Sequence, residues 1–312
     1  MDAPHAAPFR QSAQLECQSC GARLEIEPQQ RTGKCLYCGS PQVLDRPASP
    51  DRPNPTFAVG FVITRERALE IAQGFVTRAY FAPEAFRKST IEEIRGIYLP
   101  CYLYSAVAHS SYSVSIGENY TVTETYTTTD SKGNTVTRTR TRVETEWRSL
   151  SGNHTGYLSD VVVTASRGLP NDELEAIEPF DMRALKRYGP KIVSGWVAEE
   201  PSLAPNDCYA MARQEAMGSV QQRLGQFMPG DKHRGLQHNT QFHNEDLELT
   251  LLPIWVLPVR YAEDKPVVRL LVNGQTGRVA GRAPKSWVKI TLVVLFFVAL
   301  IAGAIFLMTR NG

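Results

Sequence analysis

The clearest chemistry in the sequence comes from four cysteines near its N-terminus. They form two Cys-x-x-Cys pairs, each followed by glycine, and residues 21–34 separate the pairs. Each pair can present two thiolates to one metal ion from a tight turn, in which the glycine permits a positive φ. Four thiolates complete a tetrahedral shell around Zn²⁺ and leave no position for water or substrate, so we expect a structural site. The predicted zinc ligands are Cys17, Cys20, Cys35 and Cys38.

Three other uses of these cysteines stay open: an iron centre of rubredoxin type, a redox-active Cys-x-x-Cys motif, or two disulfides. The front of the chain has no apolar run that could form the core of a signal peptide, which indicates a reducing compartment. There, the clustering of four of the six cysteines favours a metal site. Cys101 and Cys208 stand alone in apolar surroundings, where a free thiol acts as a small buried group, so we assign them no reactivity.

No further constellation in the sequence points to catalysis. GxSxG, HExxH, GxGxxG and Walker-type motifs do not occur. His233, His238 and His243 follow one another at spacings of five, which suits neither one helix face nor a zinc knuckle. We therefore expect a solvent-exposed loop there and leave the role of these histidines open. The sequence predicts no catalytic residues and no enzyme, but a protein that binds or organises partners.

The strongest hydrophobic feature is an apolar run close to the C-terminus. Residues 290–308, ITLVVLFFVALIAGAIFLM, carry no charge, and a helix of this length matches the about 30 Å hydrocarbon thickness of a bilayer. Several basic residues precede the run, with Trp287 where an interfacial aromatic is expected. We predict a tail-anchoring transmembrane helix over 287–309, in the bacterial inner (plasma) membrane, with the N-terminal bulk in the cytoplasm. Ala299 and Gly303 would permit close helix packing, so homo-oligomerisation stays open.

Between the cysteines and this run, the order of elements repeats. Residues 57–190 and 191–283 each show an apolar strand, a helical window and a strand that contains Leu-Pro. In both windows apolar residues recur at the 3.6-residue spacing that places one helix face on a sheet, as in cystatin-like or PepSY-type units. We predict an α+β fold with two such helix-on-antiparallel-sheet units, and leave open whether they share one sheet. The recurring residues are Ala68, Ile71, Ala72, Phe75 and Val76 in one window and Ala212, Ala216, Val220 and Leu224 in the other.

Residues 112–147 differ from the rest of the chain, because they alternate with period two and are dominated by threonine. Residues 130–134, DSKGN, supply a turn, so we predict a long β-hairpin that projects from the first unit. Arg138, Arg140 and Arg142 share one face of it. The row could bind phosphate or anionic lipid, but a solvated face that discourages edge pairing is the favoured interpretation.

Two further segments complete the predicted organisation. Residues 45–56, DRPASPDRPNPT, contain four prolines and indicate an extended linker. Residues 273–277, NGQTG, indicate a turn between two strands, with both glycines available for positive φ. The predicted segments are a disordered N-terminus (1–14), the zinc ribbon (15–44), the linker (45–56), the first unit (57–190) with its hairpin (112–147), the second unit (191–283) and the transmembrane helix (287–309).

Several segments together resemble a bacterial family of uncharacterised membrane proteins with a TFIIB-type zinc ribbon. They are CxxCGA…CxYCGS at 17–40, GIYLPCYLYSA at 96–106, PFDMRALKRYGP at 179–190, LLPIWVLPVRY at 251–261 and LVNGQTGRVAG at 271–281. Some such proteins are associated with phage-shock and flotillin-like (SPFH) envelope-stress modules. The resemblance thus implies a membrane adaptor that recruits cytosolic proteins.

The sequence and the resemblance lead to one expectation of function. We expect a membrane-anchored, cytoplasm-facing adaptor or scaffold with the lipid bilayer and other proteins as partners, among them SPFH or phage-shock type membrane proteins. The alternative is a membrane-tethered protein that binds nucleic acid through the ribbon. The net charge of +2 and the mixture of acidic and basic residues in 15–44 do not favour nucleic acid as a partner.

Overall fold

The fold is known from a computed structural model, which describes residues 13–16, 23–26, 32–34, 41–43, 53–91, 93–129, 133 and 135–310. Within these ranges, side chains are described for residues 32 and 33 and for residues from 53 to 303. The chain divides into two compact units, each made of separate stretches. The first unit consists of Met1–Tyr102, Val163–Cys208 and Glu248–Gly312, and the second of Leu103–Val162 and Tyr209–Leu247.

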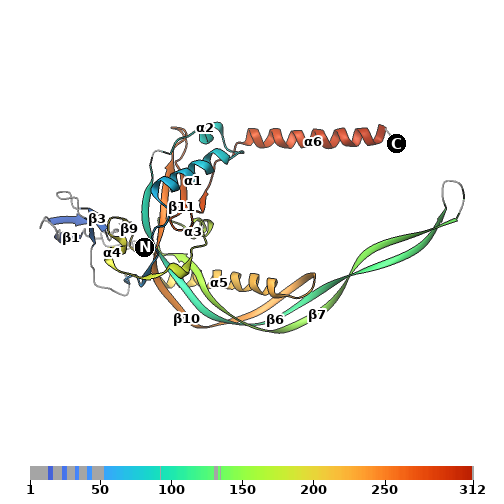
Figure 1. Cartoon of the computed structure of the whole chain (residues 1–312), viewed down its shortest axis with the longest axis horizontal. Coiled ribbons are helices and arrows are strands. Elements are labelled where there is room, and N and C mark those ends of the chain that lie inside the picture. The colour runs from blue at the N-terminus through green and yellow to red at the C-terminus, as the bar shows by residue number, and fades with distance from the viewer. Residues whose placement is uncertain are drawn as a thin grey trace, which may run out of the picture. The chain divides into compact units, whose positions relative to one another are not determined.

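The described strands from β5 to β12 belong to one eight-stranded sheet (Figure 1). Its main path runs β12-β11-β10-β5-β8, while β6 pairs with β10, β7 and β9. β10 and β11 are antiparallel, with Trp255 opposite Val272, whereas β5 and β9 pair in parallel with β10 and β6. The strands are β5 (Phe57–Ala58), β6 (Arg95–Thr129), β7 (Thr135–Thr164), β8 (Lys186–Arg187), β9 (Val197–Ala198), β10 (Lys232–Val259), β11 (Val268–Asn273) and β12 (Val279–Gly281).

Four short strands precede this sheet. β1 (Ala13–Glu16) pairs with β2 (Arg23–Ile26), and β3 (Thr32–Lys34) pairs with β4 (Pro41–Val43), both in antiparallel fashion. Thr32 is buried at 4% exposure, and its hydroxyl donates to the carbonyl of Trp196 and accepts from the Ala198 N–H at 3.0 Å. One threonine side chain therefore bonds backbone groups on both sides of Val197 in β9.

In the first unit, helix α1 (Arg65–Arg78) packs on the strands β11 and β12. Thr64 caps its N-terminus, because the threonine hydroxyl accepts from the Arg67 N–H at 3.3 Å. Ala68, Ala72 and Val76 are fully buried, as the 3.6-residue spacing predicted, and the small alanines let the helix lie close to the sheet. The other short helices of this unit are α2 (Glu84–Arg87), α3 (Asn171–Ala176), η1 (Met182–Ala184) and α4 (Pro190–Val193).

Aromatic side chains fill one end of the core in the first unit. Phe61 stacks on Trp196 with ring centroids 3.9 Å apart, and Trp255 meets both rings edge-on at 5.0 and 5.5 Å. The indole N–H of Trp255 donates to the carbonyl of Ile63 at 3.0 Å. A Cβ atom at Gly96 would come within 2.5 Å of Trp196 and 2.9 Å of Trp255, so only glycine fits beneath the two indoles.

In the second unit, helix α5 (Pro205–Phe227) covers one face of the strands β6, β7 and β10. Its inward residues Ala212, Ala216, Val220 and Leu224 are buried, which confirms the predicted helix face. Arg223 ties the outer side of the helix to β7, where it donates to the Tyr157 carbonyl at 2.8 Å and the Asp160 carboxylate at 2.9 Å.

The structure is an α+β fold made largely of strand. Strands from both predicted units, 57–190 and 191–283, lie in the same eight-stranded sheet, which the sequence had left open. The reason is that β6, β7 and β10 are much longer than ordinary strands, and each runs through both compact units. Local periodicity in the sequence does not indicate which strands pair when they lie far apart in the chain.

The predicted C-terminal transmembrane helix and the membrane location that followed from it are corrected. Helix α6 spans Trp287–Arg310, with side chains described up to Gly303. In the part of the chain that the structure describes, no helix is long and apolar enough to cross a membrane. Lys289, in the first turn of α6, donates from its ammonium group to the Ala82 carbonyl at 2.7 Å and to the Tyr80 carbonyl at 3.4 Å.

Candidate protein-interaction site

The strands β6 and β7 continue as a two-stranded ribbon past the start of β10. The Asp231 N–H donates to the Gly117 carbonyl at 3.0 Å, and the Asn119 N–H donates to the Asp231 carboxylate at 2.7 Å. β10 begins at this point. From residue 118 to its end, β6 therefore has only β7 beside it among the described strands (Figure 1). We call residues 118–129 and 135–148 the arm.

The arm is built as a β-hairpin by residues that favour extended backbone. Threonine alternates with valine, tyrosine and charged residues, which is the pattern of a solvated strand pair. Gly133 has a φ of +84°, a conformation that glycine adopts without strain, between the end of β6 and the start of β7. Tyr120 donates to the Glu144 carboxylate at 2.8 Å, and Thr145 donates to the Asn119 side chain at 2.7 Å, which fixes the strand register.

The two faces of the arm differ in chemistry, because side chains alternate along each strand. One face, which we call the threonine face, carries the odd-numbered residues and is neutral. The other, the Tyr–Arg face, carries the even-numbered residues, among which are Tyr120, Tyr126, Arg138, Arg140 and Arg142. The threonine face contains Thr121, Thr123, Thr125, Thr127, Thr129, Thr135, Thr137, Thr139, Thr141 and Thr145.

Charges on the Tyr–Arg face are unevenly neutralised. Arg142 lies 2.9 Å from the Glu124 carboxylate and 2.6 Å from that of Glu144. Nearer the body of the unit, Arg148 pairs with Glu118. Within the described residues, Arg138 and Arg140 form no ion pair, so two arginines without an ion pair lie toward the end of the arm nearest the turn, with Glu124 on the strand opposite Arg140.

The tyrosines lie among these charges. Tyr120 and Tyr126 are each 47% exposed, which leaves much of each ring available to a partner. The hydrogen bond to the Glu144 carboxylate raises the pKa of Tyr120 and holds its hydroxyl in the neutral form. Counting along both strands from the Tyr120–Glu144 contact places Tyr126 opposite Arg138.

A polar cluster anchors the strands that carry the arm to helix α5. Tyr104 and Tyr209 each donate to the Glu245 carboxylate at 2.6 Å, and Arg213 lies 3.1 Å from it. Burial acts to raise the pKa of Glu245, but the two tyrosine hydrogen bonds and the charge of Arg213 outweigh it and hold that pKa below its usual value. The carboxylate is therefore charged and fully engaged at neutral pH, as expected for a structural anchor. Sequence reasoning missed the cluster because its members lie far apart in the chain.

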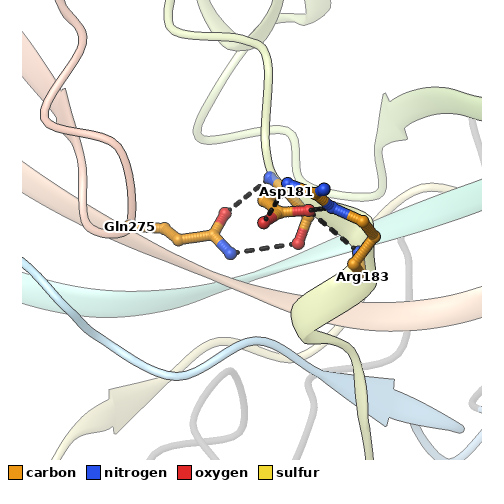
Figure 2. A network of polar contacts seen from close by, with 3 residues as sticks. All are labelled: Asp181, Arg183 and Gln275. Carbon is orange, nitrogen blue, oxygen red and sulfur yellow. Dashed lines mark hydrogen bonds and ion pairs between the residues drawn. The ribbon is translucent and has the colours of Figure 1, made fainter.

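A second polar network, in the first unit, is also structural. Figure 2 shows the Gln275 amide bonded to the backbone of Asp181, accepting from its N–H at 2.7 Å and donating to its carbonyl at 3.0 Å. The Asp181 carboxylate binds Arg183 at 2.8 and 3.1 Å, and these bonds lower the pKa of Asp181. Amide and backbone groups dominate this network, so it joins the segment around Asp181 to the β11–β12 turn and supplies no acid or base.

The predicted metal ligands Cys17, Cys20, Cys35 and Cys38 lie outside the described residues. No group of three or more His, Cys, Asp or Glu residues inside the described ranges could hold a metal ion, so the zinc ribbon is not supported as an element of the fold. The prediction of a zinc-ribbon fold rested on the spacing of the cysteines alone. The four ligands themselves stay a prediction from the sequence.

Zinc binding by the four cysteines has a direct measurement. We expect about one zinc ion per purified chain, since four thiolates fill one tetrahedral site. Replacement of all four cysteines by serine should abolish zinc binding, as measured by elemental mass spectrometry. The matched control replaces Cys101 and Cys208 by alanine and should keep the metal. Equal zinc contents in the two variants would refute the ligand assignment.

The remaining sequence candidates do not assemble into a reactive site. Cys101 and Cys208 are both buried, and burial raises the pKa of Cys101 well above its usual value and that of Cys208 to about 11. Both thiols are therefore protonated and poorly nucleophilic at neutral pH. His233, His238 and His243 lie on strand β10, so the expected loop was wrong. A strand with polar residues on both faces has the composition of a loop.

The fold and the arm define a β-rich α+β protein whose distinctive feature is an exposed two-stranded ribbon. Among curated proteins, the chain is similar to "Uncharacterized protein YdjG" of Bacillus subtilis (strain 168), with 22% identity over 241 residues. The match covers 74% of this chain and 64% of that protein, so the chain spans less than two thirds of the length of this relative. No family model matches the chain, and no solved structure matches it.

Proposed function

We propose that the chain is an adaptor without catalytic activity, which binds a protein partner through the arm. The observation that carries the proposal is a two-stranded ribbon with both faces open to solvent. A two-stranded hairpin is at best marginally stable in water, because it buries too little apolar surface. A partner that covers the arm would supply the missing burial.

The composition of the arm supports this function. Tyrosine and arginine are enriched where protein interfaces concentrate binding energy, and both are exposed on the Tyr–Arg face. Cross-strand contacts such as Tyr120–Glu144 and Arg142–Glu124 stabilise the pairing of the two strands. These contacts hold the surface in one geometry before a partner arrives, which lowers the cost of binding.

The buried thiols and phenols of the body favour a binding protein over a thiol- or tyrosine-dependent enzyme. Burial raises the pKa of Cys101, Tyr102, Tyr104 and Cys208, and in Tyr102 it reaches about 12. Each of these shifts favours the neutral, protonated form. A catalytic nucleophile or base needs the opposite shift, toward a pKa near the working pH.

A shortened arm tests the proposal. Tyr120 and Glu144 face each other across the strands, so residues 121–143 can be replaced by Asn-Gly, which forms a two-residue hairpin turn. We expect the shortened chain to fold with an unchanged thermal midpoint, because α5 and the core of the second unit are untouched. The amount of each protein that co-purifies with the intact chain should fall by at least about tenfold with the shortened chain, which corresponds to about 1.4 kcal/mol in binding free energy.

The matched control keeps the arm length and changes only the threonine face, with Thr127→Ser and Thr137→Ser. Quantitative mass spectrometry after chemical cross-linking would compare the three chains, with the phage-shock and SPFH-type proteins implied by the resemblance as the first candidates. Retention of the same partners by the shortened chain would refute the arm as the binding site.

A further inference from the structure

We infer that the Tyr–Arg face of the arm docks an acidic protein segment in extended conformation, and that the threonine face does not. The inference rests on the proposed function and names the chemistry of its partner. Three features of the arm support it: the two arginines without an ion pair, the distance between these arginines along β7, and the absence of charge on the threonine face.

The charge pattern selects an acidic partner. Arg142 is already held between Glu124 and Glu144, and Arg148 is held by Glu118. Arg138 and Arg140 form no ion pair within the described part of the chain, so their guanidinium groups are left to meet carboxylates from outside. A guanidinium group binds a carboxylate through two parallel hydrogen bonds, which gives geometric as well as electrostatic selectivity.

The spacing selects an extended segment. Arg138 and Arg140 are two residues apart on β7, so their side chains leave the same face about 6.6 Å apart. Carboxylates at alternate positions of an extended chain have the same repeat, and two of them can pair with both arginines at once. Tyr126, opposite Arg138, offers a half-exposed ring against which an intervening side chain can pack.

The surroundings disfavour a nucleic acid in this place. Glu124 and Glu144 lie on the same face as the free arginines and pair with Arg142, so acidic and basic side chains alternate there and do not form the continuous positive surface that a phosphate backbone favours. A peptide can place neutral side chains opposite these glutamates. The threonine face carries no charge, and threonine is under-represented among residues that dominate binding energy.

Fluorescence anisotropy with defined probes tests the inference on the full-length chain. The first probe is a labelled 12-residue peptide that alternates glutamate with threonine, and the second replaces every glutamate by glutamine. The third is a 12-nucleotide single-stranded DNA. We expect the acidic peptide to bind with an affinity that falls steeply as salt rises, the neutral peptide to bind at least about tenfold more weakly, and the DNA to bind more weakly than the acidic peptide.

The decisive variant is Arg138→Gln with Arg140→Gln, which should weaken binding of the acidic peptide by at least about tenfold. Its matched control, Arg167→Gln with Arg278→Gln, removes the same charge from two exposed arginines of the first unit and should stay within about twofold. Equal losses in the two variants, unchanged binding in the first, or tighter binding of DNA than of the acidic peptide would each overturn the inference.

Failure of this inference is distinguishable from failure of the proposed function. Cellular partners that are lost with the shortened arm but kept by Arg138→Gln/Arg140→Gln would leave the arm as the binding site and overturn the acidic segment. Partners kept by both variants would overturn the two together. Loss from both variants, with retention by the Arg167→Gln/Arg278→Gln control, is the result expected here.

Discussion

Replacement of Trp255 by alanine is expected to lower the free energy of unfolding by about 4 kcal/mol, within the range measured for large aromatic truncations. Trp255 is 4% exposed and packs edge-on against both Phe61 and Trp196. Its loss would open a cavity and leave the Ile63 carbonyl without its 3.0 Å hydrogen bond. Urea denaturation followed by circular dichroism measures the change.

A matched control for this variant is Trp287→Ala, because Trp287 is 75% exposed and its removal costs no core packing. Its effect should stay within about 0.5 kcal/mol. A loss of less than about 1 kcal/mol in Trp255→Ala would mean that the aromatic cluster does not stabilise the first unit as described.

Replacement of Asn273 by alanine is expected to cost about 4 kcal/mol, because four backbone groups would lose a partner at once, two in buried and two in half-buried hydrogen bonds. Asn273 is fully buried, and its amide donates to the carbonyls of Ile177 at 3.0 Å and Pro179 at 3.3 Å. Its side-chain oxygen accepts from the N–H groups of Gln275 and Thr276, both at 2.9 Å. The same denaturation experiment measures the loss.

The comparison for Asn273→Ala is Asn239→Ala, an exposed asparagine on β10. It should change stability by no more than about 0.5 kcal/mol. The network around Gln275 in Figure 2 begins in the same turn, so Asn273→Ala should also increase hydrogen exchange at the Asp181 amide. If Asn273→Ala is as stable as the control, the backbone groups find other partners and the turn does not hold that segment.

Local features of the fold could be predicted from the sequence because their causes are local. Ala68, Ala72 and Val76 recur at helical spacing and are buried on α1. The turn between β11 and β12 falls at residues 274–278, and Gly277 has the positive φ, at +78°, that its position indicated. Gly274 does not adopt positive φ but approaches Phe61, since a Cβ there would lie 2.7 Å from its ring.

Features that depend on distant contacts could not be predicted. The parallel pairing of β5 with β10 joins residues near 57 to residues near 250, and periodicity carries no information about such partners. The polar half of β10 has no apolar alternation, so its sequence indicates a loop. The Glu245 cluster could not be predicted either, because Tyr104 and Glu245 come together only through the pairing of β6 and β10.

Photo-cross-linking from the arm inside the source cells tests the central claim most directly. A benzoylphenylalanine would replace Tyr126, on the Tyr–Arg face, or the adjacent Thr127, on the threonine face. We expect a cross-linked protein from position 126, much less from position 127, and loss of the product on adding Arg138→Gln/Arg140→Gln. The absence of any cross-linked protein from both positions would show that the arm does not bind a protein partner.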